Sequence, residues 1–308
     1  MTSTTTDNAQ SPVGGIYPML YAFYDRHGDL DRDAMRAQVD FCLAAGAHGI
    51  ACLGLGTEVA ALSVQERTDV MAWAAQDIAG KVPLAVTIAG KSVAEQIAQS
   101  KSAETQGADW LVLQPPLGEQ PDEPELADFY SQVMTQTSLP TGIQNAPEYL
   151  GVGLSPAAVA NLADRHENFT VMKGEGPVSQ IRKYIAATDG KVAIFNGRGG
   201  LELPDNLRAG CAGMVPSCDS VDAQVKIYEL MQAGRIDEAY KLYGDILPLI
   251  VFIMQSLDTF WCYGKLLAAR RIGLPGPVTS RTTTMVADEF GLASLDRFAS
   301  ILKTTGKA

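Results

Sequence analysis

The sequence predicts a (β/α)₈ barrel of the TIM type, followed by a C-terminal helical extension. Short apolar, β-prone runs alternate with longer helical patterns along most of the 308 residues, and eight such runs occur. Eight strands that each lead into a helix are typical of a closed parallel barrel. An open, doubly wound sheet is the alternative, but it usually has fewer strands and does not close.

The expected strands are short and rich in apolar residues. They span Gly15–Tyr21, Gly49–Leu53, Pro83–Ile88, Trp110–Gln114, Thr141–Asn145, Thr170–Lys173, Val192–Asn196 and Ala212–Pro216. The expected helices between them span Asp31–Ala45, Ser63–Ile78, Ser92–Gln106, Pro124–Thr137, Ser155–His166 and Val178–Ala187. Local signals support these limits, because Ser63 and Glu66 form a capping box and Ser155 precedes a proline at the first helical position.

The chain divides into three parts by composition. Residues 1–12 are polar and rich in threonine, which predicts a disordered tail. Residues 13–233 carry the alternating pattern of the barrel, with Val221–Ala233 as its eighth helix. Residues 234–308 are helical in pattern without intervening strands. We therefore expect an extension packed beside the barrel, with a loop at Gly273–Val278.

Composition and charge narrow the range of functions. The formal net charge of −11 argues against a nucleic-acid partner, because phosphate binding needs a basic surface. A small anionic substrate remains possible, since it needs only a local cluster of donors. No apolar run reaches the roughly 18 residues of a membrane span, and the N-terminal residues lack the apolar core of a signal peptide. The five cysteines form no C-x-x-C pair and are expected to be free thiols, so we predict a cytoplasmic protein without a membrane partner.

Lys173 is the first candidate for catalysis. In a barrel of this type the active site forms at the C-terminal ends of the strands. Lys173 follows the apolar run Phe169–Met172, so its side chain is expected to emerge inside the mouth of the barrel. Burial without a partner would lower the pKa of the amine, and a neutral amine is the nucleophile that a Schiff base needs. The alternative is a surface lysine at a strand end, paired with a carboxylate.

Glu175 is the second candidate. It lies two residues after Lys173, which can place both side chains on the same side of the strand end. A carboxylate in that position could accept a proton from the amine and pass it to a departing oxygen. The alternative is an ordinary ion pair between a lysine and a glutamate.

Two glycine-containing loops are candidate ligand sites. Gly56 and Thr57 follow the second strand, where exposed backbone N–H groups and a hydroxyl would suit a substrate carboxylate. An ordinary strand-to-helix turn is the alternative there. Gly199 follows the seventh strand, in a segment whose glycines would let a ligand approach the backbone.

No cofactor and no metal are expected. The glycines around Gly199 do not form a nucleotide-binding fingerprint, and the sequence contains no P-loop. None of the three histidines clusters with Cys, Asp or Glu at the spacing of metal ligands. The sequence therefore predicts chemistry that is carried out by side chains alone.

Several motifs of this chain occur together in one known family. They are Gly15–Pro18 with Asp25–Gly28, Gly54-Leu-Gly-Thr-Glu58 with Leu62–Arg67, Gly107–Asp109, Leu139-Pro140 with Asn145 and Pro147, and Lys173. Over about residues 14–300 the chain resembles the dihydrodipicolinate synthase and N-acetylneuraminate lyase family of class I aldolases and lyases. The resemblance implies that Lys173 forms the Schiff base, that the substrate is a small 2-keto acid, and that the protein is a homotetramer.

The chain departs from the family pattern at two places. The tyrosine usual in the fifth strand aligns with Gln144, and the tyrosine pair usual after the fourth strand is replaced by Pro116-Leu117. Without this phenolic relay another group must move protons, and Glu175 is the best placed. The motifs G-x-G-T-E and K-G-E-G, with the missing tyrosine, resemble the branch that dehydrates 2-keto-3-deoxy sugar acids.

The resemblance implies a specific dehydration. Lys173 would attack C2 and Glu175 would act as acid and base, with L-2-keto-3-deoxyarabonate as the expected substrate and 2-oxoglutarate semialdehyde as the product. The residues expected to bind the substrate are Gly56 and Thr57 for the carboxylate, and Gln144, Arg198, Gly199 and Ser217 around the hydroxyls. Two alternatives stay open. One is a pyruvate-dependent aldolase or lyase, which would break the C3–C4 bond, and the other is a non-catalytic member that binds a keto acid.

Overall fold

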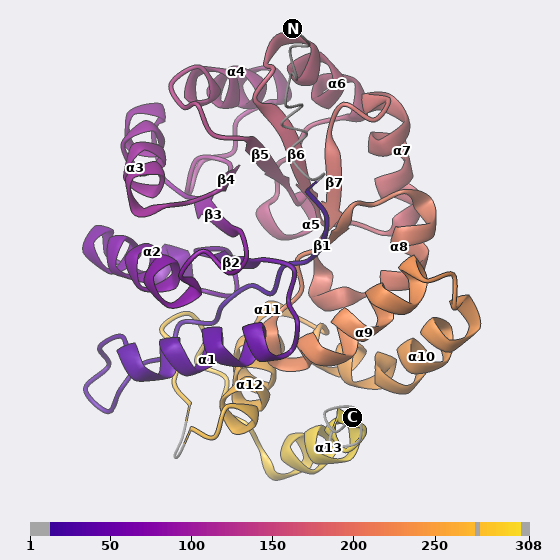
Figure 1. Cartoon of the computed structure of the whole chain (residues 1–308). Helices are drawn as coiled ribbons and strands as arrows, with labels where there is room; N and C mark the ends of the chain where they lie inside the picture. Colours follow the sequence, from indigo (N-terminus) through magenta and orange to yellow (C-terminus); the bar gives the residue numbers. More distant parts are fainter. Residues whose placement is uncertain (1–12, 275–277, 303–308) are drawn as a thin grey trace, which may run out of the picture.

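Eight parallel strands form one curled sheet, and helices surround it (Figure 1). The computed structural model describes residues 13–274 and 278–302. The strands are β1 (Gly15–Ile16), β2 (Ile50–Cys52), β3 (Leu84–Ile88), β4 (Trp110–Leu113), β5 (Thr141–Asn145), β6 (Phe169–Gly174), β7 (Ala193–Asn196) and β8 (Gly213–Met214). Each overlaps the range expected from the sequence, and β6 extends one residue beyond that range at both ends. The expected tail at residues 1–12 lies outside the described residues.

The helices follow the strands as expected. They are α1 (Arg32–Ala44), α2 (Val64–Ile78), α3 (Val93–Gln106), α4 (Glu123–Met134), α5 (Pro147–Leu150), α6 (Pro156–Arg165), α7 (Val178–Thr188), α8 (Leu203–Ala209) and α9 (Val221–Gln232). Ser63 and Glu66 form the expected capping box at the start of α2, and the hydroxyl of Ser155 caps α6 ahead of Pro156.

The sheet runs in the order β1-β8-β7-β6-β5-β4-β3-β2. Its two ends are joined by residues just after β1, because Met19 forms parallel bridges to both Ala51 and Ser217. The N–H of Ala51 donates to the carbonyl of Pro18 over 3.0 Å. Pro18 has no N–H to donate to a strand ladder. The strand β1 accordingly ends at Ile16 instead of continuing to Tyr21 as expected. Bridges instead of paired strands therefore complete the ring between β1 and β2.

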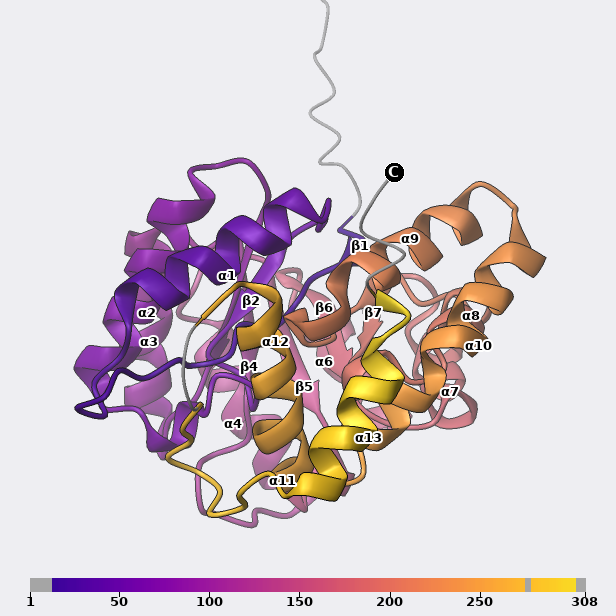
Figure 2. The same ribbon diagram turned by 90° about the horizontal axis from the view of Figure 1, so that it is seen from below.

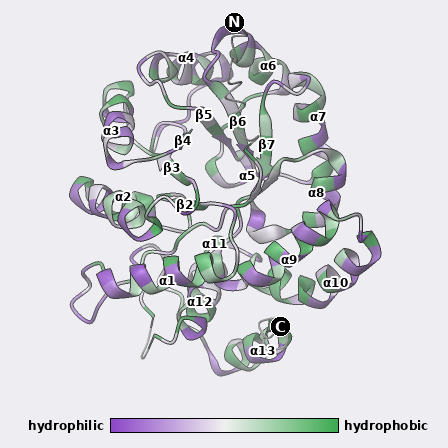
Figure 3. Cartoon of the chain, in the orientation of Figure 1, coloured by the Kyte–Doolittle hydropathy of each residue, from purple (hydrophilic) through white to green (hydrophobic). Residues whose placement is uncertain are grey.

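Aromatic side chains fill the inside of the sheet. Tyr17, Trp110 and Phe195 pack against one another, with ring centroids 5.4 to 5.6 Å apart. Smaller residues complete this cluster: Met19, Ala51, Ala85, Val112, Val171 and Val215. The interior is thus a packed core, which leaves room for a ligand only at the ends of the strands. In Figure 3 the central strands carry mainly hydrophobic colours, whereas hydrophilic colours gather on the outer helices.

In residues 234–274 and 278–302 the C-terminal part contains helices and no strand, as expected. It contains α10 (Ile236–Ile253), α11 (Leu257–Thr259), a π-helical turn (Phe260–Gly264), α12 (Lys265–Arg271) and α13 (Glu289–Ala299). Figures 1 and 2 both place α12 on the side of the barrel where α1 lies, and α13 contacts α10. The expected loop at 273–278 falls between α12 and α13, with residues 275–277 outside the described ranges.

Within the described ranges, no single helix is long and apolar enough to span a membrane. The segments Ile236–Ile253 and Leu257–Arg271 reach that threshold only when they are taken together, and they are bent by 106° relative to each other.

Candidate active site

A pocket opens at the C-terminal ends of the strands, where the sequence places the active site. Its lining comes from β6, from the segments after β1, β2, β5, β6, β7 and β8, and from the C-terminal helices. The residues are Met19, Leu55, Gly56, Tyr149, Lys173, Glu175, Arg198, Gly199, Val215, Pro216, Ser217, Met254, Leu257 and Phe260. Six of the eight predicted site residues therefore meet here, and Thr57 and Gln144 do not line the pocket.

Lys173 and Glu175 form an ion pair at the pocket. The distance between Lys173 Nζ and Glu175 Oε1 is 3.2 Å, and the two side chains are 5% and 7% exposed. Lys173 is thus buried, and it is not the surface lysine that was the alternative. It is paired with a carboxylate, whereas the first expectation was a buried amine without a partner. A buried pair of this kind must be held by further hydrogen bonds, because desolvating both charges is costly.

The neighbouring strands hold the backbone around this pair. Lys173 lies opposite Gln144 of β5 and Phe195 of β7 in the sheet. Beyond β6, the N–H of Glu175 donates to the carbonyl of Asn145 over 3.0 Å, and the N–H of Gly197 donates to the carbonyl of Gly174 over 3.0 Å. The K-G-E segment is therefore fixed on both sides, which directs both side chains toward the pocket.

A row of buried glutamines stands behind Glu175. Gln144 donates from Nε2 to Glu175 Oε2. Gln114 donates from Nε2 to Gln144 Oε1 over 2.8 Å, which turns the amide NH₂ of Gln144 toward the carboxylate. Gln96 in turn donates to the carbonyl of Gln114 over 2.9 Å. Gln144, expected to contact the substrate, instead supports Glu175, because its carbonyl oxygen is already taken by Gln114.

Glycine at position 197 makes room for the carboxylate of Glu175. A Cβ atom added to Gly197 would lie 2.4 Å from Glu175 Oε1, well inside contact distance. Any larger residue at this position would displace Glu175 away from its observed place. Close approach is therefore one reason for this glycine. A second is its backbone conformation, φ −103° and ψ −119°, which lies outside the regions that other residues favour.

The β2 loop, Gly54–Glu58, forms a second wall of the pocket. Leu55 and Gly56 line the pocket, and within the described ranges their backbone N–H groups donate no hydrogen bond. Two adjacent free N–H groups at a pocket can bind a carboxylate. Thr57, expected to share this task, is fully buried; its hydroxyl donates to the carbonyl of Leu20 over 2.6 Å and accepts from the N–H of Leu53 over 2.9 Å. Thr57 thus shapes the loop from behind.

A phenol that was not predicted from the sequence also lines the pocket. Tyr149 lies on α5, a short helix just after β5, whereas the family pattern has its tyrosines at the positions of Gln144 and of Pro116-Leu117. Burial and the nearby Glu175 carboxylate raise the pKa of Tyr149, and a hydrogen bond with Arg198 offsets part of this effect. The only available signal was an aromatic residue a few positions beyond a strand end.

Arg198 and Gly199 follow β7 on the other side of Glu175. The Arg198 guanidinium pairs with Glu202 over 3.1 Å, but its Nε is buried and has no partner among the described residues. A buried donor without a partner is rare in native structures, so this Nε is a candidate ligand contact. Gly199 has a φ of 64° and lies against Met254, where a Cβ would be 2.7 Å from the Met254 side chain.

Ser217 joins the pocket to a buried carboxylate behind it. Its hydroxyl donates to Asp219 Oδ2, and the phenol of Tyr21 donates to the same oxygen over 3.0 Å. Burial raises the pKa of Asp219, and the hydrogen bonds from Ser217 and Tyr21 offset part of this effect. Because its own proton is engaged with Asp219, Ser217 can interact with a ligand as an acceptor, through its free lone pairs.

The C-terminal helices supply the apolar part of the pocket. Met254, Leu257 and Phe260 belong to the segment that was expected only to pack beside the barrel. Sequence patterns could not indicate their role, since apolar residues on helices are usually core residues.

Within the described ranges, no group of three or more His, Cys, Asp or Glu side chains is arranged to hold a metal ion. The expectation of metal-independent chemistry remains a prediction.

The sequence profile of the Dihydrodipicolinate synthetase family matches residues 12–289. The chain belongs to this family. The resemblance inferred from the motifs is therefore confirmed, and the members to which this chain is similar include lyases, aldolases and a dehydratase.

Relatives with different activities are similar to this family member at nearly the same level. A 4-hydroxy-tetrahydrodipicolinate synthase of Methanoculleus marisnigri is 29% identical, covering 77% of this chain and 82% of the relative. An L-2-keto-3-deoxyarabonate dehydratase of Azospirillum brasilense is 29% identical, covering 81% of each. A putative 2-dehydro-3-deoxy-D-gluconate aldolase of Escherichia coli, YagE, is 28% identical, covering 80% of this chain and 82% of the relative.

Solved structures of the family share this fold. The crystal structure of YagE from Escherichia coli in complex with pyruvate has a TM-score of 0.85 at 24% identity, covering 95% of this chain and 99% of that one. Dihydrodipicolinate synthase from Thermotoga maritima has a TM-score of 0.87 at 19% identity, with the same coverage. At these identities the comparison establishes the fold.

The contact between Gly197 and Glu175 generates a prediction. We expect Gly197→Ala to fold but to move Glu175, so that the Lys173–Glu175 distance exceeds 4 Å. The free energy of unfolding should fall by about 1–3 kcal/mol, the usual cost of overpacking. A crystal structure and urea unfolding of the variant measure both effects. Gly244→Ala is the control, because an added Cβ there meets no atom within 4 Å. An unmoved Glu175 in Gly197→Ala would contradict the close approach.

Proposed function

We propose that this family member is a Schiff-base hydro-lyase that removes water from a 2-keto-3-deoxy sugar acid, with L-2-keto-3-deoxyarabonate as the best candidate. The observation that carries the proposal is the buried Lys173–Glu175 pair at the pocket. The similarity to the dehydratase of Azospirillum brasilense supports the choice of reaction.

The pair can prepare its own nucleophile. Transfer of one proton from Lys173 to Glu175 leaves a neutral amine beside a neutral acid, and the net charge of the pocket does not change. The amine then attacks C2 of the substrate to give a carbinolamine. Protonated Glu175 returns the proton to the C2 oxygen, which leaves as water, and an iminium remains on Lys173.

The iminium makes elimination possible. It withdraws electrons from C3, so that the Glu175 carboxylate can remove a C3 proton and leave an enamine. The enamine electrons expel the C4 hydroxyl, which takes a proton from Glu175 or Tyr149 and leaves as water. Hydrolysis of the imine restores Lys173. With L-2-keto-3-deoxyarabonate, movement of the new double bond toward the C5 hydroxyl gives the semialdehyde, and the net change is the loss of one water.

The other polar groups of the pocket would orient the substrate. The free N–H groups of Leu55 and Gly56 suit the carboxylate, as expected for Gly56 from the sequence. The unpartnered Nε of Arg198 and the hydroxyl of Ser217 suit the hydroxyls on C4 and beyond. Backbone atoms of Gly199 would allow the substrate to approach closely. Gln144 would act on the substrate only through Glu175.

One observation favours a second candidate, a pyruvate-dependent aldolase or lyase. Cleavage of the C3–C4 bond needs a base for the C4 hydroxyl, and the Tyr149 phenol stands in the pocket although the strand tyrosine is missing. The similarity to YagE supports this alternative. A non-catalytic binder of a keto acid is the third candidate, and covalent trapping separates it from both enzymes. A homotetramer acting on a small 2-keto acid, without nucleic-acid or membrane partners, completes the proposal.

The covalent role of Lys173 leads to the first prediction for this function. Incubation with pyruvate and borohydride should add one reduced pyruvyl group to the protein, because the reductant traps the imine on the amine. Intact mass and peptide mapping should place the group on Lys173, and Lys173→Met should gain no mass. An adduct on Lys265, the other buried lysine among the described residues, would refute the assignment.

The reaction type leads to a second prediction. A screen of 2-keto-3-deoxy acids, with products identified by NMR, should find a keto-acid semialdehyde and no pyruvate. The elimination removes the C4 hydroxyl and leaves the carbon chain intact. Release of pyruvate from the same substrates would favour the aldolase, with Tyr149 as its base.

The role of Glu175 leads to a third prediction. Glu175→Gln keeps the shape of the side chain but cannot exchange protons. We expect kcat to fall on the order of 10² to 10⁴, the usual contribution of a general acid or base. Gln144→Ala should lower kcat more than it raises KM, because it leaves Glu175 without its amide donor. Steady-state kinetics with circular dichroism tests both variants, and near-normal kcat in Glu175→Gln would place the proton transfer on another group.

A further inference from the structure

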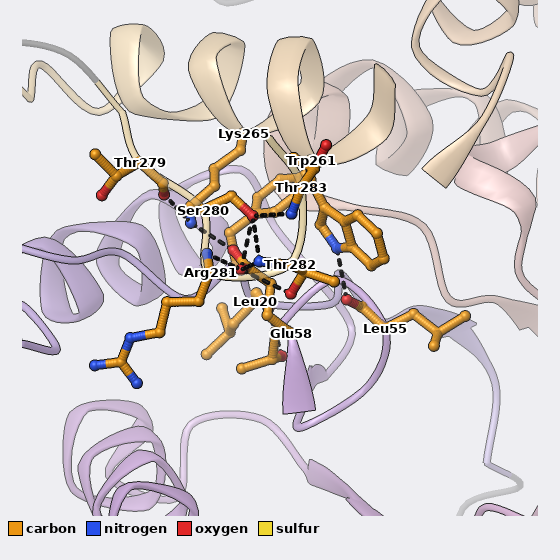
Figure 4. Close-up of polar contacts among 12 residues, drawn as sticks. Leu20, Leu55, Glu58, Trp261, Lys265, Thr279, Ser280, Arg281, Thr282 and Thr283 are labelled. Carbon is orange, nitrogen blue, oxygen red and sulfur yellow. Dashed lines mark hydrogen bonds and ion pairs between the residues drawn. The ribbon is translucent and has the colours of Figure 1, made fainter. Parts of the chain in front are cut away.

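A second buried ion pair lies outside the pocket, at the end of the β2 loop (Figure 4). Lys265 Nζ of α12 is 2.6 Å from Glu58 Oε1, and both side chains are 0% exposed. None of the proposed chemical steps uses this pair, and neither residue lines the pocket. Its position joins the C-terminal helices to the loop that carries the free N–H groups of Leu55 and Gly56.

The pair is extensively hydrogen-bonded. Glu58 Oε2 accepts from the hydroxyls of Ser280 and Thr282 and from the N–H groups of Arg281 and Thr282, over 2.7 to 3.1 Å. Lys265 also donates to the carbonyl of Thr279 over 2.5 Å. Burial lowers the pKa of Lys265, and the Glu58 carboxylate offsets part of this effect. The Glu58 carboxylate therefore binds both α12, through Lys265, and residues 280–282, and it holds them against the end of the loop.

The backbone has an unfavourable conformation at the residue before the loop and at the last residue of the loop. Leu53 has a φ of 62° and Glu58 a φ of 56°, in the left-handed region that side chains other than glycine rarely adopt. Such conformations persist only where the surroundings impose them. Thr57 holds the first end through its bonds to Leu53 and Leu20, and Lys265 with residues 279–282 holds the second.

A further contact fixes the middle of the loop from the same direction. Trp261, in the π-helical turn before α12, donates from its indole N–H to the carbonyl of Leu55 over 2.9 Å. Figure 4 shows the Trp261 and Lys265 side chains both reaching the loop from the C-terminal helices. The carbonyl of Leu55 therefore faces the helices, and this fixes the peptide plane that carries the N–H of Gly56.

Stability alone is a poor reason for such a pair. Replacing a buried ion pair by well-packed apolar side chains is often neutral or stabilising, because desolvation offsets the attraction. The aromatic rings of Tyr24 and Phe23 already surround Lys265, so an apolar residue would suit this place. Holding a strained loop in place beside the pocket is a geometric role that explains why an ion pair stands here.

We propose that Lys265, Glu58 and Trp261 are positioning residues that hold the N–H groups of Leu55 and Gly56 where a substrate carboxylate binds. The inference rests on the proposed function, since it needs a keto acid to be bound beside Lys173. It assigns the C-terminal helices a role in substrate recognition in addition to packing. The reacting carbon is bound by Lys173 on β6, so loosening the loop weakens binding without removing the chemistry.

Borohydride trapping at increasing pyruvate concentrations tests this proposal. Lys265→Met should raise the half-saturating pyruvate concentration roughly tenfold or more, because charge-assisted hydrogen bonds to the carboxylate lose their alignment. The trapping rate at saturation should stay within about twofold, since Lys173 and Glu175 are untouched. Trp261→Phe removes only the bond to Leu55 and should raise the half-saturating concentration roughly two- to tenfold. It covers the case in which Lys265→Met does not fold.

Asp222→Asn is the matched control. It breaks the ion pair between Arg271 of α12 and Asp222 of α9, whose side chains are both 15% exposed, without touching the β2 loop. It should leave the half-saturating concentration unchanged. The positioning role would be overturned if the half-saturating concentration stayed unchanged in Trp261→Phe and in folded Lys265→Met. It would also be overturned if Asp222→Asn raised that concentration equally. In either case, trapping in the wild type would still support the proposed function. Absence of trapping in the wild type would overturn the proposed function and the inference with it.

Discussion

The buried ion pair between Lys173 and Glu175 is the constraint on which the rest of the site depends. Two charges are removed from water at the mouth of the barrel, and their attraction compensates for this only if further hydrogen bonds support them. The row of amides that ends in Gln144 supplies one of these bonds, and Gly197 leaves the space that the carboxylate occupies. The pair stays neutral overall when a proton moves within it. The proposed Schiff-base chemistry uses this property, because it needs both a nucleophile and an acid at one site.

The pocket has two structural halves with different origins. The barrel provides the side chains to which we assign the chemistry, because the ends of β6 and β7 direct Glu175 and Arg198 to one pocket. The C-terminal helices provide the apolar wall, through Phe260 and its neighbours, and they hold the β2 loop through Lys265 and Trp261. The C-terminal helices thus take part in forming the site, in addition to packing beside the barrel.

Much of this could be predicted from the sequence. The eight strands follow from short apolar runs, and the fold then places Lys173 and Glu175 at the strand ends. Side-chain direction was harder to predict. Thr57 turns into the core because its hydroxyl bonds the backbone just after β2 and just after β1. Gln144 faces Glu175 because Gln114 fixes its amide. Tyr149 and Phe260 reach the pocket from helices outside the strand ends, where nothing in the local pattern distinguishes them from ordinary core residues.

The central claim is that Lys173 and the β2 loop act together on one keto acid. The most direct test is a crystal structure of the protein after reduction with borohydride in the presence of pyruvate. The account predicts continuous density from Lys173 Nζ to C2 of the reduced pyruvyl group, with its carboxylate within hydrogen-bond distance of the N–H groups of Leu55 and Gly56. A pyruvyl group on another lysine, or a carboxylate bound away from the β2 loop, would contradict it.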